Sequence, residues 1–183
     1  MQSPAIRCLF FFLAVLLTAS PAIYAQARAA APADVGTIAD IMRVSYEVIS
    51  GPAGAPRQWD RDRTLYMPGA TFVVTSKRAG KVQTTIMTTE EYRQKSDARF
   101  VAEGLFETEI GSRVERFGNV AQVRSVSVAR RTPTGPIEGR YVNYAQLYWD
   151  GNRWWIAAMV WDEERPDNPI PAAWLSHPNK GSN

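Results

Sequence analysis

The second half of the chain alternates between hydrophobic and polar residues, which is the period of a β-strand. The alternation runs through four segments, at about 105–117, 120–131, 139–150 and 153–162. Glycine and asparagine stand between the first and second segments, and again between the third and fourth, as is typical of tight turns. The pattern therefore predicts a run of antiparallel strands.

The first half has apolar residues three and four positions apart, which is the spacing of an amphipathic helix. This spacing predicts a helix that begins at Asp34 and stops at 50–52, where Ser, Gly and Pro follow one another. A short amphipathic piece is expected at 59–65. Pro68 and Gly69 should then break the regular structure.

Two further elements complete the expected fold. Segments 71–75 and 82–87 flank a short turn and predict a hairpin. Thr88 and Glu91 form a capping-box pattern, which predicts a helix ending at Gly104. Helices first and strands last indicate an α+β fold, with N-terminal helices packed in a curved antiparallel sheet that encloses a pocket.

The chain starts with the pattern of a secretory signal peptide. Arg7 precedes an apolar run at 9–17, and small residues lead to Ala25. The run is shorter than the roughly 20 residues of a membrane span. We therefore expect cleavage before Gln26, no membrane anchor afterwards, and a product in the periplasm or outside the cell.

Composition shifts divide the chain into four parts: 1–25 as signal peptide, 26–33 as a flexible mature N-terminus, 34–163 as one domain, and 164–183 as a Pro-rich tail. Prolines in the tail cannot continue a central strand. Trp174 is expected to pack back on the body of the domain.

The residue types exclude several chemistries. The one cysteine, Cys8, lies in the expected signal peptide, and the one histidine, His177, lies in the tail. Thiol catalysis, histidine triads, metal sites and cofactors are therefore not expected. The net charge of +3 is small and basic residues alternate with acids, so no nucleic-acid partner is expected.

The chain over 34–163 resembles the nuclear-transport-factor-2-like (NTF2-like), or SnoaL-like, superfamily. The resemblance is most specific at 114–123, VERFGNVAQV, and at 146–156, QLYWDGNRWWI. It implies a cone-shaped, cystatin-like α+β fold. It implies no single function, because the superfamily includes isomerases, dehydratases, hydrolases, cyclases and non-catalytic binding modules.

The last strand is apolar on both faces. Strict alternation places Trp155, Met159 and Trp161 together, opposite Trp154 and Ile156. The second apolar face could line a ligand pocket, lie under the tail, or form a homodimer interface. The residues we expect to contact a ligand are Trp59, Asn143, Trp155, Met159 and Trp161.

A catalytic site would need a carboxylate in the cone. Asp60 at the cavity mouth is the candidate base, with Tyr46 or Tyr66 as proton donor. The competing interpretation is an exposed Asp60 paired with Arg57 or Arg63.

Glu107 and Glu109 share a face of their strand and are further candidates for a carboxylate in the cone. The simpler interpretation is a solvated ion-pair ladder with Arg113 or Arg124 on the adjacent strand.

Two functions from different classes remain open on these residues. The first is an exported module that binds a small apolar molecule or a protein partner in the pocket. The alternative is a cofactor-free isomerase, dehydratase or hydrolase. The absence of histidine from the expected domain favours binding.

The signal-peptide interpretation predicts a mass. Protein recovered from its native host should begin at Gln26, because the peptidase accepts the small Ala25 at its −1 site. Intact-mass spectrometry would show this directly, and a mature protein that retains Met1 would contradict it.

Overall fold

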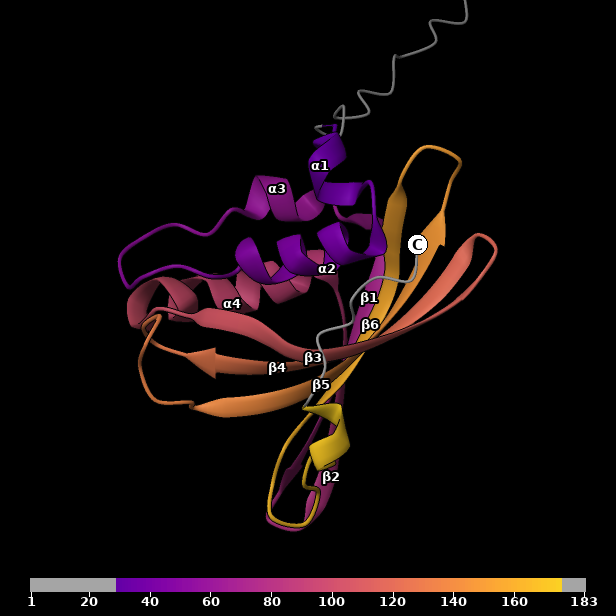
Figure 1. Ribbon diagram of the computed structural model, residues 1–183. Coiled ribbons are helices and arrows are strands. Elements are labelled where there is room, and N and C mark those ends of the chain that lie inside the picture. The colour runs from indigo at the N-terminus through magenta and orange to yellow at the C-terminus, as the bar shows by residue number, and fades with distance from the viewer. Residues whose placement is uncertain (1–28, 176–183) are drawn as a thin grey trace, which may run out of the picture.

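The computed structural model describes residues 29–175; the expected signal peptide, its cleavage site before Gln26 and His177 lie outside the described residues. None of the described helices is long and apolar enough to cross a membrane. The elements drawn in Figure 1 are the helices α1 (Pro32–Val35), α2 (Ile38–Glu47), α3 (Trp59–Arg63) and α4 (Thr89–Glu103), the strands β1 (Tyr66–Arg78), β2 (Lys81–Thr88), β3 (Phe106–Phe117), β4 (Val120–Arg130), β5 (Gly139–Trp149) and β6 (Trp154–Glu163), and the short 3-10 helix η1 (Ala172–Trp174).

The strands form one sheet in the order β2-β1-β6-β5-β4-β3. β3 to β6 are an antiparallel meander whose bounds agree with the predicted segments to within one residue. β1 pairs with β2 antiparallel and with β6 in parallel. Figure 1 shows α1 to α4 gathered on one side of the curved sheet. The expected α+β architecture, helices packed in a curved and mostly antiparallel sheet, is confirmed.

The capping box at the start of α4 is confirmed. The Thr88 side chain accepts from the Glu91 N–H at 3.2 Å, and the Glu91 carboxylate accepts from the Thr88 N–H at 2.7 Å. Gly104 ends the helix with φ at 75°, and a Cβ there would lie 2.8 Å from the Arg131 carbonyl oxygen. Only glycine meets both conditions.

Two predicted boundaries are wrong. The Thr37 side chain accepts from the Asp40 N–H at 3.0 Å and caps a new helix, so the predicted first helix is two, α1 and α2. Pro68 and Gly69 lie inside β1 rather than ending the structure. The register between β1 and β6 shifts between Tyr66 and Thr71, which accommodates a proline with no N–H to donate.

A β-bulge in β6 changes which side chains face the helices. Ala157 has no partner in β5, so the alternation is reset at this residue. Met159 and Trp161 consequently share the concave face with Trp154, whereas Trp155 faces the outside. The expectation that Trp155 shares a face with Met159 and Trp161 is therefore wrong, because it assumed unbroken alternation.

A second bulge in β3 acts in the same way. Ile110 has no partner in β4. Glu107 and Glu109 before it, and Ser112 after it, all lie on the concave face, while Gly111 turns outward.

A buried ion pair joins α3 to α4. Asp62 accepts from Arg93 Nε at 2.6 Å, and both side chains are 5% exposed. Burial raises the pKa of Asp62 to about 6, although the neighbouring Arg93 opposes the shift. Removing one partner from such a pair leaves an uncompensated charge, typically at a cost of about 3–5 kcal/mol.

The loop between α2 and α3 is held by Arg57, which is 6% exposed. Its guanidinium donates to the carbonyl oxygens of Gly51 and Ala55, each at 2.9 Å, and to that of Phe100 near the end of α4. This side chain therefore ties the loop to α4 through backbone groups.

The C-terminal segment crosses the outer face of the sheet. Ile170 is buried, and Arg124 of β4 lies 3.9 Å from the centre of the Trp174 ring. A Cβ on Gly111 would lie 2.0 Å from the Trp174 carbonyl oxygen. The expectation that Trp174 packs back on the body is confirmed, and part of the outer apolar face is covered by the chain itself.

The close approach at Gly111 predicts that Gly111→Val displaces the tail. Its φ lies outside the left-handed region, so the effect would be steric. Chymotrypsin should then cleave after Trp174 several-fold faster than in the wild type, because a detached tail is open to proteases.

Ser112→Val, on the concave face of the same strand, is the matched control and should cleave at the wild-type rate. Equal cleavage of the Gly111 variant and the wild type would contradict the packing of the tail.

Candidate functional site

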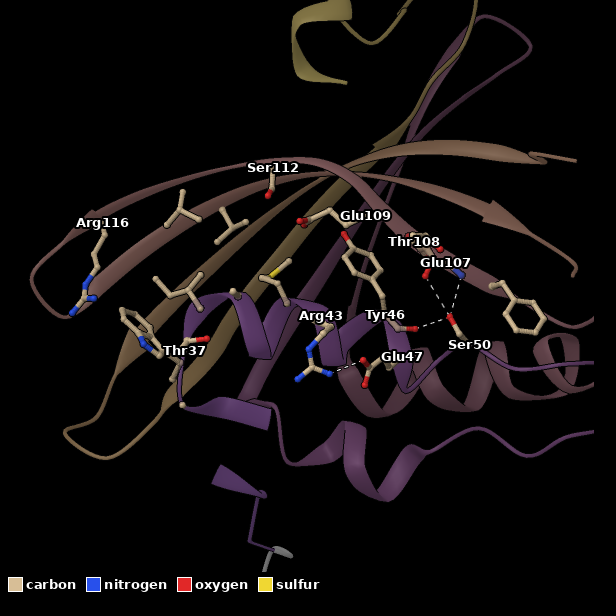
Figure 2. Close-up of a pocket in the computed structure, with 18 residues that line it drawn as sticks. Thr37, Arg43, Tyr46, Glu47, Ser50, Glu107, Thr108, Glu109, Ser112 and Arg116 are labelled. Atoms are coloured by element: carbon tan, nitrogen blue, oxygen red, sulfur yellow. Dashed lines mark hydrogen bonds and ion pairs between the residues drawn. The ribbon is translucent and has the colours of Figure 1, made fainter. Parts of the chain in front are cut away.

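An open groove of about 690 Å³ runs between α2 and β3 (Figure 2). Its helix side carries Arg43 and Glu47, which pair with each other at 2.5 Å. Its strand side carries Glu109 and Arg116. In Figure 2 the Tyr46 ring extends from α2 toward Glu109, at the inner side of the groove.

A second cavity of about 280 Å³ lies inside the cone, between α2, α4 and the concave face of the sheet. Phe72 is the centre of its aromatic wall, with ring centroids 5.1 Å from Tyr92, 5.2 Å from Tyr66 and 5.5 Å from Trp161, all edge to face. Such contacts stabilise a rigid apolar lining. The aromatic residues that line this inner cavity are Tyr46, Tyr66, Phe72, Tyr92, Phe100, Tyr141 and Trp161.

A polar network separates the groove from the inner cavity, and Tyr46 and Glu107 line both. Asn143 Nδ2 donates to the Tyr46 hydroxyl and to Ser127 Oγ, each at 3.2 Å. Ser127 donates to Glu107 at 2.6 Å. The Tyr46 hydroxyl lies 2.7 Å from Ser125 Oγ, and Ser125 donates to Glu109.

The direction of these hydrogen bonds follows from counting protons. A serine hydroxyl has one proton, and Ser125 gives its proton to Glu109, so Tyr46 must donate to Ser125. Two chains therefore start at the amide of Asn143 and end at carboxylates, one on Glu107 and one on Glu109.

Burial determines the protonation of this cluster. It raises the pKa of the hydroxyls of Tyr46, Tyr66 and Tyr92, which therefore stay protonated at neutral pH. Burial also raises the pKa of the Glu107 carboxyl, and the hydrogen bond from Ser127 lowers it in part. Glu107 thus holds its proton to a higher pH than a glutamate in water does.

Five of the residues predicted for a site line the inner cavity. The structure brings Tyr46, Tyr66, Asn143, Met159 and Trp161 together there, although they come from α2 and three different strands.

The other predicted residues lie elsewhere. Asp60 is 77% exposed and accepts from Arg63 at 3.0 Å, away from Tyr46 and Tyr66. Trp59 donates to Asp97 and borders a surface pocket with Asp60. Trp155 on the outer face lies 3.7 Å under Arg153 and donates to Asp150 at 2.7 Å.

The ladder predicted for Glu107 and Glu109 is wrong. Both carboxylates point into the cone and accept from serines of β4, and the bulge at Ile110 puts Arg113 on the opposite, outer face. Arg113 pairs instead with Glu115, and Arg124 covers Trp174. The available signal was the pair Ser125 and Ser127, two positions apart in β4, which marks a short polar stripe on a buried face.

Within residues 29–175, no three His, Cys, Asp or Glu side chains gather in a way that could hold a metal ion. The polar groups that line the inner cavity include the hydroxyls of its tyrosines, the amide of Asn143 and the carboxyl of Glu107.

Comparison with known proteins gave matches among solved structures. Protein-family models and curated proteins each gave no match. Among solved structures, a Mycobacterium tuberculosis protein of unknown function is 18% identical with a TM-score of 0.49, covering 75% of either chain. An NTF2-like protein of unknown function from Shewanella baltica is 8% identical, with a TM-score of 0.45 and coverage of 68% of this chain and 86% of that one.

A third solved structure, from Novosphingobium aromaticivorans, is described as an NTF2-like protein with a cystatin-like fold. It is 16% identical, with a TM-score of 0.43 and coverage of 60% of this chain and 69% of that one. Two of these three structures are described as NTF2-like, the superfamily that the sequence over 34–163 resembles, and the likeness concerns the fold alone.

The buried position of Glu107 predicts a pH dependence of stability. Because the folded pKa is raised above the unfolded one, the folded state keeps a proton that the unfolded state has already lost. This contribution to stability is present below the unfolded pKa and is lost as the pH rises through the folded pKa.

Glu107→Gln has no proton to lose and can still accept from Ser127. Its free energy of unfolding relative to wild type should therefore rise as the pH increases from the ordinary glutamate pKa of about 4.3 through the raised pKa of Glu107. Urea unfolding at several pH values measures this, with the exposed Glu115→Gln as control. Parallel curves for wild type and Glu107→Gln would refute the prediction.

Proposed function

We propose that this chain is a binding module whose inner cavity takes a small, largely apolar molecule. The observation that carries the proposal is the aromatic wall around Phe72, with ring centroids 5.1–5.5 Å apart, next to a few fixed polar groups. Ligand sites are typically apolar with a small number of oriented polar groups. Asn143 and Glu107 supply those groups here.

The arrangement of the catalytic candidates favours binding over the enzymatic alternative. Asp60 does not line the inner cavity, and the proton of the Tyr46 hydroxyl is engaged with Ser125. A general base must lie within hydrogen-bond reach of its substrate. Asp60 and Tyr46 therefore do not form an acid–base pair.

The proposal includes export, since residues 1–25 have the pattern of a signal peptide and the module would then act in the periplasm or outside the cell. A small-molecule ligand is preferred to a homodimer through the sheet face. The tail already covers part of the outer face beside Gly111 and Arg124.

The proposal predicts binding of a neutral apolar probe such as N-phenyl-1-naphthylamine, whose emission should rise and shift to the blue in the cavity. Trp161→Ala should weaken binding about fivefold or more, because an aromatic contact contributes about 1 kcal/mol. Fluorescence titration gives the dissociation constants.

Trp155→Ala is the matched control, since it removes the same side chain from the outer face of the same strand and should leave the affinity unchanged. Thermal melting of both variants checks that each is folded. Absence of binding to the wild type, or equal losses in the two variants, would overturn the proposal.

A further inference from the structure

The mouth of the inner cavity carries two cations from one helix. Lys95 and Arg99 are exposed and line the cavity. They lie four residues apart on α4, which places their Cβ atoms about 5–6 Å from each other on one face of the helix. Like charges at this spacing repel, so the helix alone does not favour them.

Among the described residues, no acid of α4 forms an ion pair with these cations, although Glu91 is near enough to Lys95 for a Coulombic interaction. Neither Lys95 nor Arg99 forms an ion pair with any residue in the described range 29–175. Each acid of the helix is bound elsewhere: Glu90 to Arg63 and Arg93, Glu91 to Thr88 in the capping box, Asp97 to Trp59, and Glu103 to Arg131.

Two acids of the sheet, Glu163 and Glu107, interact electrostatically with Tyr141 of the cavity wall. Glu163 pairs in register with Tyr141 at the end of β6, and it does not line the cavity. Glu107 is the one carboxylate among the described residues that line the cavity, and it accepts from Ser127 at the polar floor. The positive charge of Lys95 and Arg99 therefore stands at the entrance, apart from the buried acid.

We infer that the ligand of the inner cavity is an amphipathic organic anion, with an apolar body against the aromatic wall and one anionic group between Lys95 and Arg99. This inference rests on the proposed binding function and specifies its ligand class. A paired lysine and arginine suit a carboxylate, which accepts hydrogen bonds from both side chains. The apolar body would then extend inward past Tyr92 and Trp161.

Two probes of nearly equal shape test the inference. Naphthalene-2-carboxylate carries the charge and naphthalene-2-carboxamide does not, and isothermal titration calorimetry at low salt measures both affinities. The carboxylate should bind about tenfold more tightly than the amide, as expected for two partly exposed ion pairs.

In the variant Lys95→Gln/Arg99→Gln, the carboxylate and the amide should bind with about equal affinity. The affinity for the amide should stay at the wild-type value, which shows that the cavity is intact. Arg78→Gln/Lys81→Gln, at the far tip of the β1–β2 hairpin, makes the same change in net charge and should keep the preference.

The outcomes separate the two proposals. If neither probe binds, the cavity function itself fails. If both bind equally to the wild type, or if the carboxylate preference survives Lys95→Gln/Arg99→Gln, the cavity function stands and the anion inference is overturned. A preference lost equally in both double variants would indicate net charge rather than a site, and would also overturn it.

Discussion

The two β-bulges decide which side chains face the inside of the cone. A single unpaired residue in a strand reverses the alternation beyond it. If β6 alternated regularly through Ala157, the side chains of Met159 and Trp161 would face the outer surface and the aromatic wall would lose Trp161. The same holds at Ile110, where the bulge keeps Glu107 and Ser112 on one face. The contents of both cavities therefore depend on where these two residues stand.

The polar network is the second requirement of the interior. Burying the amide of Asn143 and two carboxylates costs free energy unless each finds a partner, and the serines of β4 provide the partners. Because the hydrogen bonds run one after another, each hydroxyl has a fixed donor direction. The network thus orients the floor of the inner cavity before any ligand arrives, and it leaves the aromatic wall to supply the contact area.

Local patterns in the sequence were sufficient for the elements and insufficient for the site. Alternation and turn residues located β3 to β6, and Thr88 with Glu91 located α4. Each of these signals consists of residues only a few positions apart in the chain. The bulge at Ala157 gave no signal, since an alanine between apolar neighbours fits either face. The contact between Tyr46 and Ser125 joins residues 79 positions apart, and the partners in the parallel pairing of β1 with β6 are 87 to 90 positions apart, so neither could be derived from spacing.

The way Arg57 is bound has a consequence for how the molecule responds to acid. Its partners are carbonyl oxygens of the loop and of α4, and carbonyls do not titrate. The ion pair of Asp62 with Arg93 joins α3 to α4. The pKa of Asp62 is about 6, so below this pH its carboxyl is neutral beside the charged Arg93. Acidification therefore changes the charge of the contact between α3 and α4, whereas the hydrogen bonds of Arg57 that anchor the loop after α2 to the far end of α4 keep theirs.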